Sequence, residues 1–131
     1  MRVFKTKTFN RGARKAGVAD AELGKSVARI LAGKIDADLG AHLVKQRVSQ
    51  GEGGRTGGHR AIIVHKYGDR IVFVHLFAKS ARANLTGEEL ETYRDLAKII
   101  ADLAPEQVER LLETKEWIEI DHGKEQAGLS E

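Results

Sequence analysis

Cysteine is absent from the 131-residue chain, and proline and tryptophan each occur once. This excludes disulfides, thiolate nucleophiles and sulfur-ligated zinc, and we expect a reducing compartment, by default the cytoplasm. The longest apolar runs, such as Ala61–Val64 and Ile71–Val74, are far shorter than the ~20 residues that cross a bilayer. The first 17 residues also lack the apolar centre of a secretory signal. We therefore expect a soluble protein that does not contact a membrane.

Several catalytic signatures are also missing. The sequence contains no GxxxxGK[ST], GxSxG or HExxH motif, so phosphate-loop nucleotide hydrolysis, serine esterase chemistry and zincin proteolysis have no support. Hydrophobic residues make up 41% of the chain and charged residues 31%, which is enough apolar material for one core. We expect a single domain over residues 1–131.

Charge is distributed unevenly along the chain. Residues 1–85 contain 17 Lys and Arg against 6 Asp and Glu, a balance of +11, whereas residues 86–131 contain 5 against 13, a balance of −8. This asymmetry predicts a basic core, residues 1–85, that neutralises phosphates, and an acidic helical segment, residues 86–131, that faces away from nucleic acid. The alternative is that terminal helices are simply acidic and solvated.

Periodicity and capping residues predict an α+β protein. The expected elements are a strand over 2–7, a helix capped by Thr8, a helix capped by Asp20, strands over 39–48, 59–67 and 70–79, helices beginning near Thr86 and Pro105, and a short edge strand over 117–121. Thr86 and Glu89 have the spacing of a capping box, and Gly68-Asp69 is a hairpin turn.

Cations at strand positions are the main candidates for a site. Alternation places Lys45 and Arg47 on one side of their strand and Gln46 on the other. A two-residue turn at Gly68-Asp69 predicts that Lys79 lies opposite His59 in the hairpin. The proposed patch consists of Lys45, Arg47, Arg55 in the glycine-rich loop 51–58, Arg60, Lys79 and Arg82. Its donors suit a phosphodiester; the alternative is a scatter of solvated side chains.

The five histidines do not indicate a metal site. His59, His65 and His75 lie in the hairpin without a carboxylate placed to complete a ligand set, so we expect no metal and no other cofactor. His65 and His75 fit half-buried strand positions. His59 follows the glycine-rich loop and is a candidate for binding a phosphate.

Several stretches in this order resemble the RelE/HigB branch of bacterial type II toxins, within the RelE/ParE superfamily. They are VFKTKTFNRGARKAG at 3–17, IDADLG at 35–40, LVKQRV at 43–48, GGHR at 57–60 and FAKSARANL at 77–85. The resemblance implies a small RelE-like fold with two N-terminal helices packed on a mostly antiparallel sheet and with C-terminal helices. It also implies a toxin that cuts messenger RNA in the ribosomal A site and inhibits translation. The implied partners are the ribosome, mRNA and a cognate antitoxin of the helix-turn-helix type.

RNA cleavage by the adjacent 2′-hydroxyl needs a proton acceptor, a group that stabilises the phosphorane and a proton donor to the leaving oxygen, and cations can supply all three. By resemblance, Lys45 and Arg47 match the family's basic strand, Arg60 its transition-state-stabilising arginine and Lys79 its late-strand cation. Arg55, His59 and Arg82 are expected to bind RNA. A lysine acting as base requires its pKa to fall from ~10.4 toward neutrality, and nearby like charges favour that. Which cation is base and which is acid stays open.

One departure concerns the aromatic hydroxyl that RelE relatives often place near the substrate base. Residues 79–85 contain no tyrosine, and Tyr67 lies beside the hairpin turn, so His59, His75 or Phe77 are the expected stacking groups. Two other functions stay open. A ParE-like inhibitor would bind DNA gyrase without cleaving RNA, and a non-catalytic nucleic-acid-binding module would show steep salt dependence.

Overall fold

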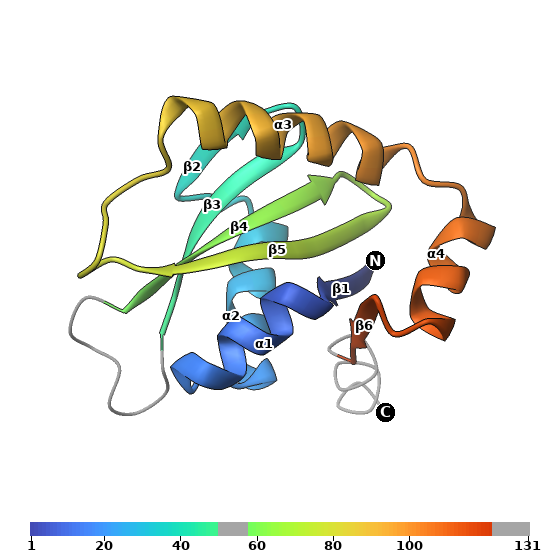
Figure 1. Ribbon diagram of the computed structural model, residues 1–131, viewed down its shortest axis with the longest axis horizontal. Helices are drawn as coiled ribbons and strands as arrows, with labels where there is room; N and C mark the ends of the chain where they lie inside the picture. The colour runs from blue at the N-terminus through green and yellow to red at the C-terminus, as the bar shows by residue number, and fades with distance from the viewer. Residues whose placement is uncertain (50–57, 122–131) are drawn as a thin grey trace.

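The computed structural model describes residues 1–49 and 58–121, which form four helices and one six-stranded sheet (Figure 1). The elements are β1 (Arg2–Thr6), α1 (Lys7–Ala16), α2 (Asp20–Leu31), β2 (Ala37–Gly40), β3 (Leu43–Val48), β4 (His59–Lys66), β5 (Arg70–Ala78), α3 (Gly87–Ala101), α4 (Pro105–Glu113) and β6 (Trp117–Ile120). The architecture is α+β, as predicted, and none of these helices is long and apolar enough to cross a membrane.

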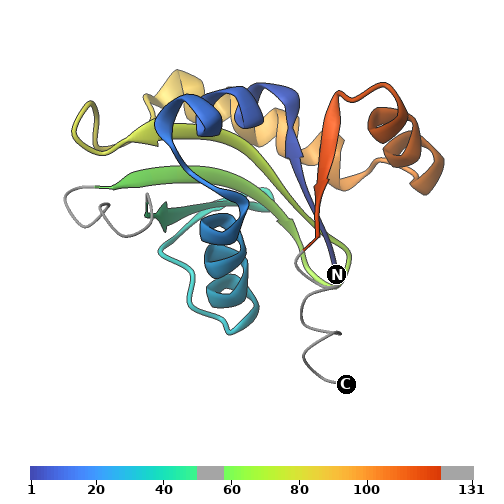
Figure 2. The ribbon, with the colours of Figure 1, turned by 90° about the horizontal axis from the view of Figure 1, so that it is seen from below.

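The strand order is β2-β3-β4-β5-β1-β6, and the sheet is mostly antiparallel because only β1 and β5 run parallel. Helices cover both faces: α1 and α2 lie on one side of the sheet and α3 lies across the other (Figure 1). Figure 2 shows β1 and β6 side by side next to α4. Each face therefore has its own core. Phe9 and Phe73 pack under α1 and α2, whereas Phe4 and Trp117 belong to the core on the other face.

Both N-terminal helices begin differently from the prediction. Thr6, not Thr8, caps α1, and its Oγ1 accepts a hydrogen bond from the amide of Phe9 at 3.0 Å. Asp20 lies inside α2, whose N-cap is Ala19. The Asp20 carboxylate instead accepts from Nζ of the buried Lys5 at 2.6 Å, because a buried ammonium group needs a partner.

The predicted strand over 39–48 is two strands, β2 and β3, so the prediction missed β2. The chain reverses through three residues with positive φ, Gly40 (83°), Ala41 (54°) and His42 (71°). Ala41 and His42 are not glycine, and positive φ is uncommon for other residues. The turn could therefore not be predicted from the residue types. The alternation predicted for β3 is confirmed, since Gln46 is fully buried and the odd-numbered residues Lys45 and Arg47 point to the opposite face.

The predicted hairpin register is wrong by one residue at its open end. His59 pairs with Ala78, not with Lys79. The loop contains three residues, Tyr67 to Asp69, instead of the two that were predicted. The register also changes by one residue between Ile62 and Ile63, where a bulge leaves an extra residue in β5. Tyr67 is the first residue of this loop and is 90% exposed.

Residues 86–121 of the acidic segment are built into the fold. Its predicted capping box at Thr86 and Glu89, the start of α4 at Pro105 and the edge strand β6 are all confirmed. Lys66 Nζ donates to the carbonyl of Ala101 (2.7 Å) and Arg70 Nη1 to that of Ile100 (3.0 Å), so two of the basic residues stabilise the C-terminal end of α3.

Candidate functional site

Three of the predicted site cations share one face of the sheet. Arg47 on β3 is paired directly with Arg60 on β4, and Lys45 with Ile62. Because side chains alternate along a strand, Lys45, Arg47 and Arg60 lie on the same side as Ile62, which belongs to the core under α3. We call these three residues the cation cluster.

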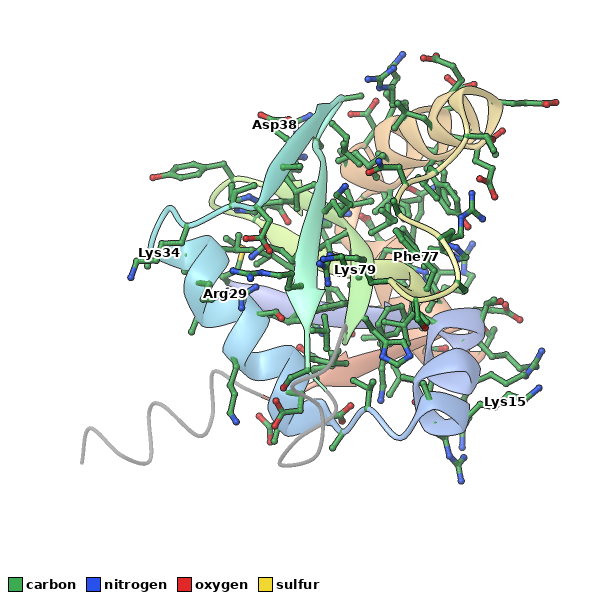
Figure 3. The ribbon with its side chains drawn as sticks, turned by 90° about the vertical axis from the view of Figure 1, so that its left-hand side faces the viewer. Lys15, Arg29, Lys34, Asp38, Phe77 and Lys79 are labelled. Atoms are coloured by element: carbon green, nitrogen blue, oxygen red, sulfur yellow. The ribbon has the colours of Figure 1, made fainter. Side chains whose placement is uncertain are left out.

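Lys79 lies next to the cluster. It directly follows β5, in which Phe77 is paired with Arg60, and its amide donates to the carbonyl of Gly58 at 3.3 Å. Figure 3 looks at this end of the molecule and shows Phe77 and Lys79 close together near its centre, with Lys15 of α1 and Lys34 beyond α2 toward the edges. The side chain of Lys79 is exposed.

The predicted RNA-binding residue His59 does not share the face of the cluster. His59 is paired with Val48, a residue of the core under α1 and α2, so its side chain alternates to the opposite face from Arg60. Burial also lowers the pKa of His59, which disfavours the cation that would bind a phosphate. Arg55 lies outside the described residues.

The third, Arg82, is paired with a carboxylate that the sequence reading did not place there. Both terminal nitrogens of Arg82 donate to Glu89 in the first turn of α3, and Arg82 Cζ lies 5.7 Å from the ring centroid of Phe77. Glu89 also accepts from the amide of Thr86, and these contacts, led by the Arg82 hydrogen bond, lower the pKa of Glu89 to about 2. The acidic segment therefore does not face entirely away from the cations: its first helical turn contacts one of them.

Lys45 is held by the segment that joins β5 to α3. Its Nζ donates to Oδ1 of Asn84 at 2.5 Å, and Arg82 Nε donates to the carbonyl of Asn84 at 3.1 Å. The segment between β5 and α3 thus fixes one cluster lysine and one arginine together. FAKSARANL contains Arg82 and Asn84, but their contact with Lys45 depends on how this segment folds back over β3.

An aromatic group with a hydroxyl stands beside the cluster. Tyr93 of α3 stacks on His75 with ring centroids 5.3 Å apart and an interplanar angle of 28°, and His75 lies 5.9 Å from Phe77. His75 is paired with Ile62, which is also the partner of Lys45, so the rings adjoin the cations across one strand. Tyr93 lies outside residues 79–85, where the resemblance places the aromatic hydroxyl. Its helical spacing indicated a core position, so it was not predicted as a site residue.

Burial determines the protonation of this stack. It lowers the pKa of His75 and raises that of Tyr93. At neutral pH the histidine ring is therefore uncharged and the tyrosine hydroxyl keeps its proton. Neutral rings favour stacking with a base, and a protonated phenol is a hydrogen-bond donor.

Cations beside aromatic rings on one face of a small α+β domain are suited to an RNA strand, since the cations bind phosphate and the rings stack with bases. Among residues 1–49 and 58–121, no three His, Asp or Glu side chains are grouped to hold a metal ion.

The fold is that of a small α+β domain with cations and aromatic rings on one face of its sheet. The family model described as "RelE toxin of RelE / RelB toxin-antitoxin system" matches residues 1–120, most of the chain, and the chain therefore belongs to the RelE toxin family. It is a toxin of a toxin–antitoxin system, with a cognate antitoxin as its partner. No curated protein matches the sequence.

Proposed function

We propose that this toxin is a metal-independent endoribonuclease that cleaves mRNA on the translating ribosome and so inhibits translation in the cytoplasm. The observation that supports this most is the shared face of Lys45, Arg47 and Arg60, next to the stack of His75 and Tyr93. A protein that only binds RNA needs positive side chains to attract the phosphates. It does not need a lysine that is held beside two arginines.

In the proposed reaction the 2′-oxygen of one nucleotide attacks the adjacent phosphorus. Its proton passes to the amine of Lys45, since a lysine can exchange a proton whereas arginine stays charged. The bond from phosphorus to the 5′-oxygen breaks, and Lys79 protonates that oxygen. The products are a 2′,3′-cyclic phosphate and a 5′-hydroxyl, and no metal is required.

Arg47 and Arg60 serve the phosphate. Their guanidinium groups project from directly paired positions, so that both are within reach of one phosphodiester. Arg60 is proposed to stabilise the negative charge that develops on the phosphorane, and Arg47 to bind the ground-state phosphate. Arg60 Nη1 donates to the carbonyl of His59 at 3.2 Å, which helps to orient it.

The aromatic stack is proposed to receive a nucleobase flanking the scissile bond. Burial keeps the Tyr93 hydroxyl protonated, so it supplies a hydrogen-bond donor. By resemblance, such a hydroxyl was expected within residues 79–85. The antitoxin is proposed to be of the helix-turn-helix type.

Mapping of transcript 5′ ends after brief expression tests the proposal against the gyrase alternative. The proposal expects new 5′-hydroxyl ends within translated codons, and loss of those ends when translation initiation is blocked. Intact transcripts with DNA breaks would instead support a ParE-like gyrase inhibitor, and intact transcripts without growth arrest a non-catalytic binding module.

A further inference from the structure

Exposed apolar side chains gather in one groove on the far side of the molecule. Among the described residues, six large hydrophobic side chains are exposed, and four of them, Met1, Leu31, Ile35 and Tyr67, line a groove of about 560 Å³. His65 also lines the groove. Single exposed apolar residues are ordinary, but a contiguous group marks a surface that binds a partner.

The groove lies away from the cation cluster in two respects. His65 on β4 is paired with Ile71, a residue of the core under α1 and α2, whereas Arg60 projects to the α3 side. The groove also lies at the hairpin-turn end of β4, roughly 17 Å along the strand from Arg60. A molecule bound in the groove therefore leaves the cation cluster open.

The rim of the groove carries positive charge. Lys34 stands between two lining residues, Gly33 and Ile35. The neighbouring carboxylates are already paired, Asp36 with Arg29 at 3.4 Å and Asp69 with Arg70 at 2.8 Å. Within residues 1–49 and 58–121 this leaves Lys34 without an anionic partner.

We propose that this groove docks an apolar segment of the cognate antitoxin that is flanked by aspartate or glutamate side chains. The apolar side chains would cover Leu31, Ile35 and Tyr67, and a flanking carboxylate would pair with Lys34. A second copy of the toxin fits poorly, because a two-fold contact would place Lys34 on both rims without a carboxylate to pair with it. The inference rests on membership of the toxin family and not on the RNA-cleavage chemistry.

The position of the groove gives this contact a defined role. It anchors the antitoxin without touching Lys45, Arg47 or Arg60, so any part of the antitoxin that blocks RNA must do so from a second contact. Affinity for the antitoxin and access of RNA to the cation cluster are therefore separable by mutation.

Calorimetric titration of purified toxin with its cognate antitoxin tests the docking site. The groove variant is Leu31→Ser with Tyr67→Ser, and the matched control is Leu96→Ser with Ile99→Ser, which changes the other two large hydrophobic side chains exposed in the described ranges. We expect the groove variant to lose at least tenfold in affinity and the control less than twofold, with similar melting temperatures. Equal affinities for the two variants would overturn the proposal, whatever the toxin does to RNA.

Two further measurements identify the occupant. Lys34→Glu should weaken binding several-fold at low salt and less at high salt, because the lost contact is electrostatic. A photo-crosslinking residue at position 67 should capture the antitoxin, whereas one at position 99 should not. Sedimentation that showed a dimer of toxin alone, abolished by the groove variant, would assign the groove to a second copy and overturn the proposal.

Discussion

Arg47 and Arg60 lie directly opposite each other on adjacent strands, β3 and β4. Directly opposed like charges destabilise a strand pair, and the carboxylate of Asp36 lies 3.7 Å from Arg47 Nε. In the proposed function, a phosphate of the RNA binds between the two guanidinium groups.

The first prediction follows from that pair. Arg47→Gln should change the free energy of unfolding by less than about 0.5 kcal/mol, because the side chain is exposed and its ion pair is long. The same substitution should weaken RNA binding several-fold. Chemical denaturation and RNA titration measure the two effects, with Lys15→Gln, an exposed residue of α1, as the charge-matched control. A large loss of stability with unchanged RNA affinity would show that Arg47 is structural.

Glu89 should limit the number of cations available to RNA. Because Glu89 neutralises Arg82, Glu89→Gln should free one guanidinium group and steepen the dependence of log K on log salt by about 0.7 for single-stranded RNA. The helix start should survive, since glutamine also fits the third position of a capping box.

The matched control for this change is Glu91→Gln, which removes the same charge from the same helix. Its partner Arg94 stays anchored to the carbonyl of Leu39 at 2.7 Å, so its slope should stay at the wild-type value. Identical slopes for wild type and Glu89→Gln would show that Arg82 is not held back by Glu89.

Gln46 should be structural although it lies between two site residues. Its side chain is fully buried; Oε1 accepts from the amide of Asp36 at 2.6 Å, and Nε2 donates to the carbonyl of Lys34 at 3.2 Å. Gln46→Leu leaves both backbone groups unpaired and should cost about 2–4 kcal/mol in the free energy of unfolding. Urea denaturation measures this, and a cost below about 0.5 kcal/mol would mean that water replaces the amide.

Three histidines should make the fold less stable in mild acid. Burial lowers the pKa of His59, His65 and His75, so below their ordinary value of about 6.5 the unfolded chain binds protons that the folded chain does not. The free energy of unfolding should therefore fall as the pH drops from 7.5 to 5.5. His75→Phe should reduce the dependence of the free energy of unfolding on pH, and Lys15→Gln should leave it unchanged. The same pH dependence in His75→Phe as in the wild type would show that His75 does not contribute.

Much of the fold could be predicted, because its signals are local. Alternation along 43–48 identified Lys45 and Arg47 as neighbours on one face, and the capping box located the start of α3. The features that were missed depend on distant contacts. The bulge that shifts the hairpin register depends on pairing between β4 and β5, and the turn at Ala41 and His42 carries no strong local signal.

The candidate site shows the same limit. Strand spacing could place Lys45 and Arg47 on one face, but the pairing of Arg60 with Arg47 depends on how β3 and β4 align. The pairing of Arg82 with Glu89 and the stacking of Tyr93 on His75 arise when α3 packs across the sheet. The placement of Lys79 opposite His59 was predicted from a register that proved to be one residue wrong. Contacts between residues on separate elements could therefore be identified only from the three-dimensional structure.

The proposed cleavage of RNA requires the cation cluster to act as one site. The most direct test is the single-turnover cleavage rate of mRNA on programmed ribosomes, measured for the wild type, Lys45→Gln, Arg60→Gln and the control Lys15→Gln. Loss of a general base or of a transition-state contact should lower the rate by a factor of about 100 or more in both cluster variants, while Lys15→Gln cuts at the wild-type rate. Cleavage by both cluster variants at the wild-type rate would contradict the account.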